Sequence, residues 1–165
     1  LSDVDLVFET MLVLVGGDET TRHVISGGME ALLRHPDQLA QLQADPGLLP
    51  AAIEEMLRWV TPIRNMNRTA TRDVEIGGQH VHEGDRILLL YPSANRDEVV
   101  FDDPFRFDIH RSPNEHVASG ATAGITAWVL PRLPDIQLAS DAPPPRRRGN
   151  FVLGLNSLPV TFTPR

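Results

Sequence analysis

Residues 11–21 read MLVLVGGDETT and lie in the middle of a segment that predicts one long helix. Ser2, followed three residues later by Asp5, is a helix-start pattern, and no proline occurs before Pro36. The predicted helix has about thirty residues and a length of roughly 50 Å, at a rise of 1.5 Å per residue. A helix of this length usually crosses a protein larger than this chain. We therefore expect the other elements to be organised around this helix.

Two glycines, Gly16 and Gly17, interrupt this helix at its centre. Each costs about 1 kcal/mol relative to alanine, so their presence suggests that another body approaches the backbone there. They also loosen the hydrogen bonds next to Glu19 and Thr20. An acid beside an alcohol on such a helix is suited to proton delivery, because the hydroxyl can bond to a carbonyl one turn earlier or turn toward a water. A kinked core helix with a polar exit is the alternative interpretation of this stretch.

The composition is that of a soluble globular domain, with 165 residues, 41% apolar and 22% charged. A formal net charge of -7 argues against a nucleic-acid surface. No apolar run approaches the roughly eighteen residues that a membrane span needs, and there is no signal-peptide pattern. We therefore expect a cytoplasmic protein, and the missing initiator methionine suggests that the chain was cut from something longer.

Metal and thiol chemistry have little support in the sequence. There is no cysteine, which excludes disulfides, zinc thiolates and a thiol nucleophile. His80 and His82 alternate along one predicted strand and share a face, with Glu83 nearby. Exposed strand histidines are common and no third ligand is indicated, so no metal site is predicted.

The rest of the chain predicts short elements. A polar helix begins at Pro36, and another helix over residues 50–60 carries Glu55 and Arg58 three residues apart, close enough to pair. Taken alone, this pair is a surface ion pair worth a few tenths of a kcal/mol. Short β segments follow, at residues 74–76, 79–81 and 87–91, with a Gly-Gly hairpin turn between the first two. Residues 92–111 predict a long loop that is either functional or packed by its own side chains.

Three separated motifs then occur in order: GGDETT at residues 16–21, EMLR at residues 55–58 and PFRF at residues 104–107. They resemble the I-helix, ExxR and PxRF motifs of the cytochrome P450 family. The closest likeness is to bacterial members that hydroxylate the side chain of cholesterol and related steroids. It implies a fold that is mainly α with small antiparallel β-sheets, as a single partial P450 domain over residues 1–165. Residues 1–118 would run from the I helix to the meander, and residues 130–165 would form the C-terminal β region.

The resemblance implies a heme-thiolate monooxygenase that inserts one atom of dioxygen into a C–H bond. Gly16 and Gly17 would face the distal side of the heme, and Glu19 with Thr20 would relay protons. Arg68 aligns with a position that binds a heme propionate, a contact suited to a guanidinium.

The same resemblance assigns structural and binding roles. Glu55, Arg58 and Arg106 would form a buried triad on the proximal side, which is costly to break if it is dry. Leu155 and its neighbours would contact the substrate. The implied cofactor is heme, and the implied partners are a ferredoxin-type redox protein and a lipophilic, steroid-like substrate.

One region departs from the family pattern. Residues 119–129 replace the glycine-rich loop that should hold the iron-ligating cysteine, together with most of the helix behind the heme. Thiolate donation favours O–O cleavage, and no other residue of the chain supplies it. We therefore expect a truncated, inactive relative of the monooxygenases; the alternative is a non-catalytic remnant or an apolar-ligand-binding fragment without heme. The long helix would then expose apolar surface that it was built to bury.

Overall fold

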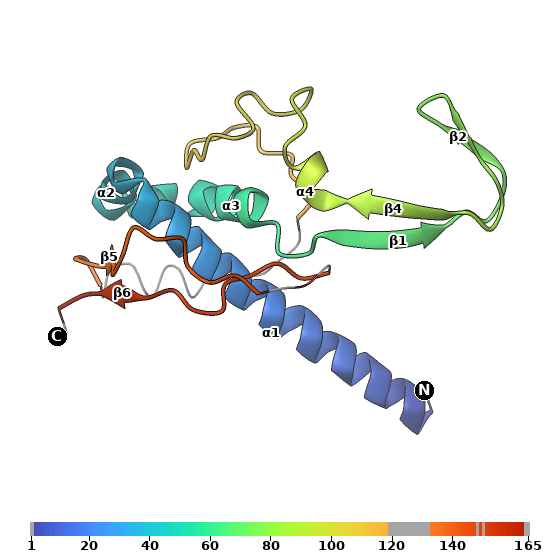
Figure 1. The fold of residues 1–165 in the computed structure, drawn as a ribbon, viewed down its shortest axis with the longest axis horizontal. Helices are drawn as coiled ribbons and strands as arrows, with labels where there is room; N and C mark the ends of the chain where they lie inside the picture. The colour runs from blue at the N-terminus through green and yellow to red at the C-terminus, as the bar shows by residue number, and fades with distance from the viewer. Residues whose placement is uncertain (1, 119–132, 148, 150, 164–165) are drawn as a thin grey trace.

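The computed structural model describes residues 2–118, 133–147, 149 and 151–163. In the described residues, two helices and one small sheet lie against the second half of a long first helix, and a two-stranded ribbon leads away from them to a hairpin (Figure 1). The elements, in chain order, are α1 (Asp3–Arg34), α2 (Pro36–Ala44), η1 (Pro46–Leu48), α3 (Leu49–Val60), β1 (Asn65–Thr69), β2 (Val74–Ile76), β3 (Gln79–Val81), β4 (Arg86–Leu90), α4 (Tyr91–Ala94), β5 (Gln137–Leu138) and β6 (Val160–Thr161).

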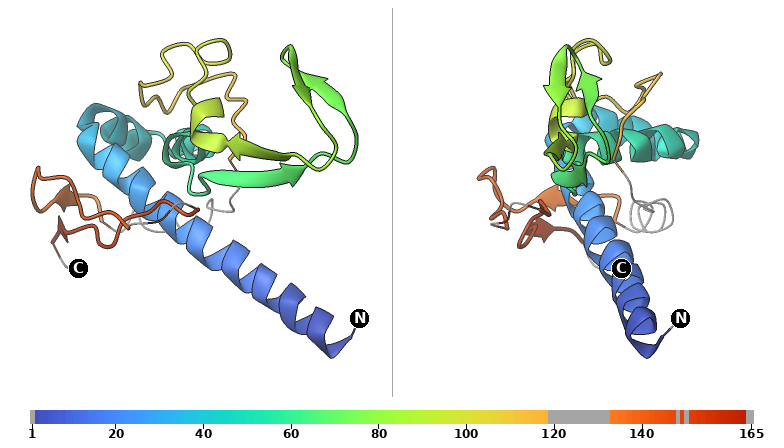
Figure 2. Two further views of the ribbon diagram at one scale, coloured as in Figure 1. Left: turned by 45° about the vertical axis from the view of Figure 1, so that its right-hand side comes forward. Right: turned by 90° about the vertical axis from the view of Figure 1, so that its right-hand side faces the viewer.

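Helix α1 begins where the sequence predicted and continues through both central glycines without a break. The Ser2 hydroxyl accepts a hydrogen bond from the Asp5 amide at 3.2 Å, and the Asp5 carboxylate accepts one from the Ser2 amide at 2.9 Å. This reciprocal pair is a capping box, which satisfies two backbone donors at the helix start. The first half of α1 projects away from the other elements (Figure 2).

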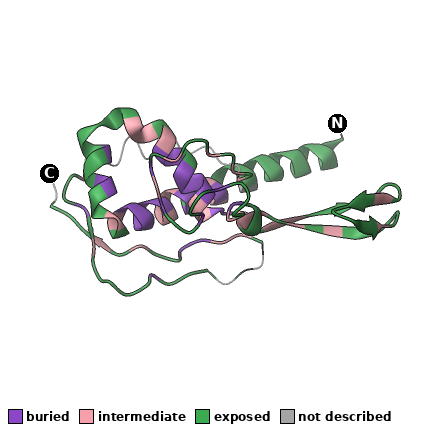
Figure 3. Cartoon of the chain, turned by 90° about the horizontal axis from the view of Figure 1, so that it is seen from above, coloured by how far each residue is buried: buried purple, intermediate pink, exposed green. Residues whose placement is uncertain are grey.

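The core lies between the second half of α1 and helices α2 and α3, where the buried residues gather (Figure 3). Here α1 and α3 approach through glycines: a Cβ atom at Gly28 would lie 2.7 Å from Met56 Cγ, and one at Gly27 would lie 2.9 Å from Val60 Cγ2. The buried apolar residues of this core are Val24, Met29, Ala31, Leu32, Leu39, Leu42, Ala52, Ile53, Met56, Leu57, Phe107, Ile109 and Ile136.

In the part of the chain that the structure describes, the strands form three two-stranded antiparallel sheets. Strands β1 and β4 pair with Asn65 opposite Leu90, and β2 and β3 form the hairpin with the predicted bounds. Its turn residues Gly77 and Gly78 have φ values of 57° and 76°, which glycine adopts without the strain that a Cβ atom would cause. Together with the helices, these sheets confirm the predicted fold class.

Residues 86–94 differ from the sequence-based expectation in two details. The last predicted strand ends at Leu90, and the expected loop after it begins with the helical turn α4. Pro92 lies in the first turn of α4, where its fixed φ suits a helix and its missing N–H is not needed.

The first half of α1 exposes its apolar side chains, which confirms the expectation from the sequence. Each of these side chains is more than half exposed: Val4, Leu6, Val7, Phe8, Met11, Leu12, Val13 and Leu14. Among the described residues, no helix combines the length and the apolar character that crossing a membrane requires.

Candidate functional site

A fully buried ion pair lies at the centre of the molecule. Glu55 and Arg58 are one turn apart on α3, and neither has any exposed surface. Arg58 Nε and Nη2 donate to the two Glu55 carboxylate oxygens, each at 2.7 Å. Its remaining donors reach the backbone carbonyls of Asn95 (2.9 Å), Pro104 (2.8 Å) and Arg106 (3.0 Å). All five guanidinium N–H groups are thus satisfied, as a buried charge requires.

The expected third member of this cluster takes part through its backbone. Arg106 contributes its carbonyl oxygen, whereas its side chain is 66% exposed and lies 3.8 Å from Asp108. The second guanidinium near Glu55 is that of Arg111, whose Nε lies 3.2 Å from Glu55 Oε2. Sequence reasoning missed Arg111, because it lies outside the three motifs and its role depends on how the loop returns to α3.

Two further residues join the end of α3 to the turn after α4. The fully buried side chain of Asn95 donates to Thr61 Oγ1 at 2.8 Å. Arg96 donates to the carbonyls of Arg58 (3.0 Å) and Trp59 (2.8 Å), and its guanidinium carbon lies 4.7 Å from the centroid of the Trp59 ring. Burial, assisted by the nearby Arg58 cation, lowers the pKa of Arg96 to about 10. These contacts fix the start of the loop that carries the PFRF motif.

The same loop is held to α2 by a buried amide. Gln38 donates to the carbonyl of Phe107 at 2.7 Å and accepts from the amide of Ile109 at 2.9 Å. Between these two residues, the Asp108 amide donates to Glu55 Oε1 at 2.9 Å. The loop is therefore packed by specific side chains, which is one of the two roles that its length suggested. Gln38 carries no sequence signal for this role, since it is a polar residue on a polar helix.

On α1, the candidate acid and alcohol occupy different surroundings. The buried Thr20 hydroxyl donates to the carbonyl of Gly16 at 2.6 Å, the bond to the preceding turn that the sequence allowed. Glu19 is surrounded by basic groups: Arg22 Nη2 at 2.6 Å, His23 Nε2 at 2.9 Å and Arg147 Nη1 at 3.0 Å. The hydrogen bond from Arg22 is the main cause that lowers the pKa of Glu19, and this cluster favours its ionised form.

We expect Arg22→Gln to raise the pKa of Glu19 more than Arg147→Gln does, because the Arg22 hydrogen bond is the larger cause of the lowered value. A carboxyl group whose pKa is lowered in the folded state stabilises that state at pH values above its ordinary pKa of 4.5. This contribution is lost as the pH falls through the folded-state pKa. An NMR titration of the Glu19 side-chain carboxyl carbon in the parent chain and the two variants measures the shifts. A larger shift in the Arg147 variant would contradict this assignment.

The C-terminal segment lies along α1 and brings Leu155 to it. Arg146 Nη2 lies 3.1 Å from Glu30 Oε2, and the Arg146 and Leu155 backbones form a bridge. Leu155 is buried and lines a hollow together with His23 of α1. Gly154 packs against the His23 ring so closely that a methyl group there would collide with the ring. Leu155, the candidate for substrate contact, thus lies beside His23, whose Nε2 is 2.9 Å from Glu19.

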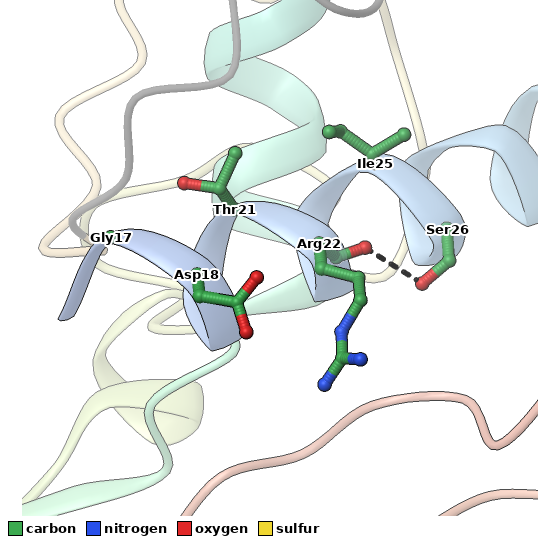
Figure 4. A pocket seen from close by; sticks show the side chains of 6 residues that line it. All are labelled: Gly17, Asp18, Thr21, Arg22, Ile25 and Ser26. Carbon is green, nitrogen blue, oxygen red and sulfur yellow. Dashed lines mark hydrogen bonds between the residues drawn. The ribbon is translucent and has the colours of Figure 1, made fainter. Parts of the chain in front are cut away.

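The other candidate residues lie on exposed surfaces. Among the residues that the structure describes, none has an atom within 4 Å of a Cβ atom built at Gly16 or Gly17, apart from the helix's own backbone and the adjoining residues. Arg68 is exposed on β1, and its Nη1 donates to the carbonyl of Asn67 at 2.9 Å. A surface hollow on α1 continues from Gly17 toward Ser26, whose hydroxyl donates to the carbonyl of Arg22 at 3.0 Å (Figure 4).

Known proteins resemble this chain along almost its whole length. It is 52% identical to a steroid C26-monooxygenase of Mycolicibacterium smegmatis and 37% identical to a methyl-branched lipid omega-hydroxylase of Mycobacterium bovis, in each case over 99% of the chain. These matches cover 44% and 41% of the relatives, so the chain spans less than half of their length. The first alignment extends over 178 residues, more than the 165 of this chain, so the relative carries residues within the matched span that are missing here.

Structural comparison agrees with the sequence comparison. A cytochrome P450 of Mycobacterium marinum, solved in complex with pseudoionone, superposes with a TM-score of 0.87 at 38% identity, over 98% of this chain and 42% of that one. The sequence profile of the family described as Cytochrome P450 matches residues 47–123, which include the Glu55–Arg58 pair and its loop. From its sequence, its fold and its buried ion pair, the chain belongs to the cytochrome P450 family.

Proposed function

We propose that this chain is part of a steroid-hydroxylating type of P450 monooxygenase, and that it does not itself form a thiolate-ligated heme centre. One observation carries the proposal: the buried Glu55–Arg58 pair and its loop are complete, whereas the chain has no cysteine. In the family this packing would support the proximal side of the heme, and the chain lacks the thiolate ligand that the family's chemistry needs.

The similarity to the steroid C26-monooxygenase supports a steroid-like substrate for the parent activity. In that activity, heme supplies dioxygen activation and a ferredoxin-type protein supplies electrons. Glu19 and Thr20 are the candidates for proton transfer, Gly16 and Gly17 for the heme-facing surface, and Leu155 for substrate contact. These assignments follow from the motifs and remain part of the proposal.

The residues present do not fit a heme-thiolate site. In the described part of the chain, no group of three histidine or acidic side chains could hold a metal ion. His110 Nε2 lies 2.7 Å from Gln41 Oε1, and His116 Nε2 lies 2.8 Å from Glu54 Oε2, so each ring already has a polar partner. Arg68, the propionate candidate, is exposed on β1. The replaced loop at residues 119–129 lies outside the described residues.

The reduced carbon monoxide difference spectrum of the purified chain, mixed with heme, tests the proposal. We expect no thiolate-type Soret band, because thiolate ligation needs a cysteine. The Mycolicibacterium smegmatis relative, treated in the same way, is the positive control. A thiolate-type band from this chain would overturn the proposal.

A thermal-unfolding series with a steroid separates the two forms of an inactive chain. A ligand that binds the folded state raises the melting temperature by an amount that grows with the ratio of its concentration to its dissociation constant. An unchanged melting temperature supports the non-catalytic remnant. A melting temperature that rises with the logarithm of the steroid concentration, without the Soret band, supports an apolar-ligand-binding fragment.

A further inference from the structure

The hairpin of β2 and β3 carries two histidines and two acids on one face. Figure 1 shows this hairpin at the end of the β1–β4 ribbon, away from the helices. In its register, Glu75 lies opposite His80. Side chains alternate between the two faces of a strand, so Asp73 and His82, each two residues along from this pair, lie on the same face. The hairpin thus gathers groups that are otherwise separated by its turn.

The imidazole rings of His80 and His82 are in contact. Their centroids lie 4.5 Å apart, and their planes form an angle of 83°. Imidazole nitrogens bind metal ions at about 2.0–2.1 Å, so two imidazoles bound to one ion at a right angle have centroids about 4.5 Å apart. At the tetrahedral angle, the same bond lengths give a separation of about 5.2 Å. The observed spacing therefore fits the square-planar or tetragonal geometry that is typical of Cu²⁺ and Ni²⁺.

Each ring also has a carboxylate beside one of its two nitrogens. His80 Nε2 lies 3.9 Å from Asp73 Oδ2, and His82 Nδ1 lies 3.6 Å from Asp85 Oδ2. Metal-bound histidines usually present their other ring nitrogen to a carboxylate, which fixes the ring orientation and makes the bound nitrogen more basic. In this arrangement, His80 Nδ1 and His82 Nε2 are left to bind an ion.

The backbone of the hairpin fixes both carboxylates. The Glu83 amide donates to Asp73 Oδ1 at 2.7 Å, and the His82 amide donates to Asp85 Oδ2 at 2.8 Å. Residues 73–85 contain four acids and neither lysine nor arginine, so their charge favours a cation. The sequence pattern alone did not indicate a site, because the two carboxylates become neighbours of the rings only through the fold of the hairpin.

We propose that His80 and His82 form a site for one divalent transition-metal ion, Cu²⁺ in preference to Ni²⁺. His80 Nδ1 and His82 Nε2 are its two protein ligands, and water occupies the other positions. In the described residues, no third histidine or acid completes the site, so Asp73 and Asp85 orient the rings instead of binding the ion. The site lies outside the three P450 motifs and does not depend on the proposed function.

Titration of the untagged chain with Cu²⁺, followed by calorimetry and electron paramagnetic resonance, tests the site. We expect one ion per chain, with coupling from two directly bound nitrogen atoms. Asp73→Asn should weaken binding by about 10–100-fold, the usual effect of removing a carboxylate that orients a ligand, and it keeps an oxygen for the Glu83 amide. His80→Gln should weaken binding more and leave one coupled nitrogen. The affinity of the parent chain should fall from Cu²⁺ to Ni²⁺.

A variant with the same number of histidines is the matched control. Gln79→His combined with His80→Gln moves one ring to the opposite face of β3, and Gln79 is exposed, so the hairpin should still form. This variant should bind as weakly as His80→Gln alone. His110→Gln, in the loop beside α2, should leave binding unchanged. No Cu²⁺ binding by the parent chain, undiminished binding by the rearranged variant, or an equal loss in His110→Gln would overturn the proposal.

Discussion

Replacing Glu55 by glutamine should lower the free energy of unfolding by about 3–5 kcal/mol, the usual cost of removing one member of a buried ion pair. Glu55 Oε1 accepts from Arg58 Nη2 and from the Asp108 amide, and Oε2 accepts from Arg58 Nε and lies near Arg111 Nε. Whichever oxygen becomes an NH2 group, it faces donors rather than acceptors. Two buried or nearly buried guanidinium groups would also lose their counter-charge.

Urea unfolding, followed by circular dichroism, measures this loss. Arg106→Ala is the matched control, because the Arg106 side chain is largely exposed and its backbone carbonyl, which the substitution keeps, makes the contact with Arg58. Surface changes of this kind usually stay within about 0.5 kcal/mol. Equal destabilisation by both substitutions would show that the Arg106 side chain belongs to the buried cluster, as the motif implied. If Glu55→Gln leaves the unfolding midpoint unchanged, the buried pair does not stabilise this chain.

The parts of the fold that depend on local sequence were predicted well. The start of α1 follows from Ser2 and Asp5, and the hairpin follows from a Gly-Gly turn between two short strands. In both cases the contacts join residues a few positions apart, so the pattern contains the whole interaction. The order of the three motifs also identified the family, because three separated motifs in a fixed order are specific to one fold, whereas a single motif reflects only one contact.

The residues that fix the loop could not be predicted, because their contacts span long stretches of the chain. Gln38 bonds to Phe107 and Ile109, about seventy residues away, and Arg111 approaches Glu55 from the far end of the loop. Nothing near Gln38 distinguishes it from an exposed glutamine on a polar helix. The loop partner of Arg58 likewise depends on which atoms of the loop turn inward, and the backbone path places the carbonyl of Arg106 there.

Helix α1 contains two pairs of adjacent glycines, and only one of them lies where another element packs closely against the backbone. Gly16 and Gly17 suggested a close approach of another body, yet nothing in the described residues lies within 4 Å of a Cβ atom there. The close approach within this chain occurs further along the same helix, where Gly27 and Gly28 pack against α3. Both pairs share the same composition, so the sequence alone does not separate them.

Gly28→Val should therefore lower the free energy of unfolding by about 1–3 kcal/mol, the usual cost of overpacking a core. A Cβ atom at Gly28 would lie 2.7 Å from both Cγ and Sδ of Met56, and this methionine is fully buried. The side chain has no solvent to move into, so α1 and α3 must separate or Met56 must leave its rotamer. The separation would also disturb the helix that carries Glu55 and Arg58.

The control is the same kind of change in open space. Gly17→Ala adds a methyl group that meets no atom of the other described elements within 4 Å, and it should stabilise the chain by about 0.4–1 kcal/mol through the lower entropy of the unfolded state. A double-mutant cycle with Met56→Ala then locates the clash. If Gly28→Val is less harmful in the Met56→Ala background than in the parent chain, the two side chains compete for one space. Additive losses would show instead that the packing of α1 on α3 tolerates a side chain at Gly28, and that valine destabilises through helix propensity.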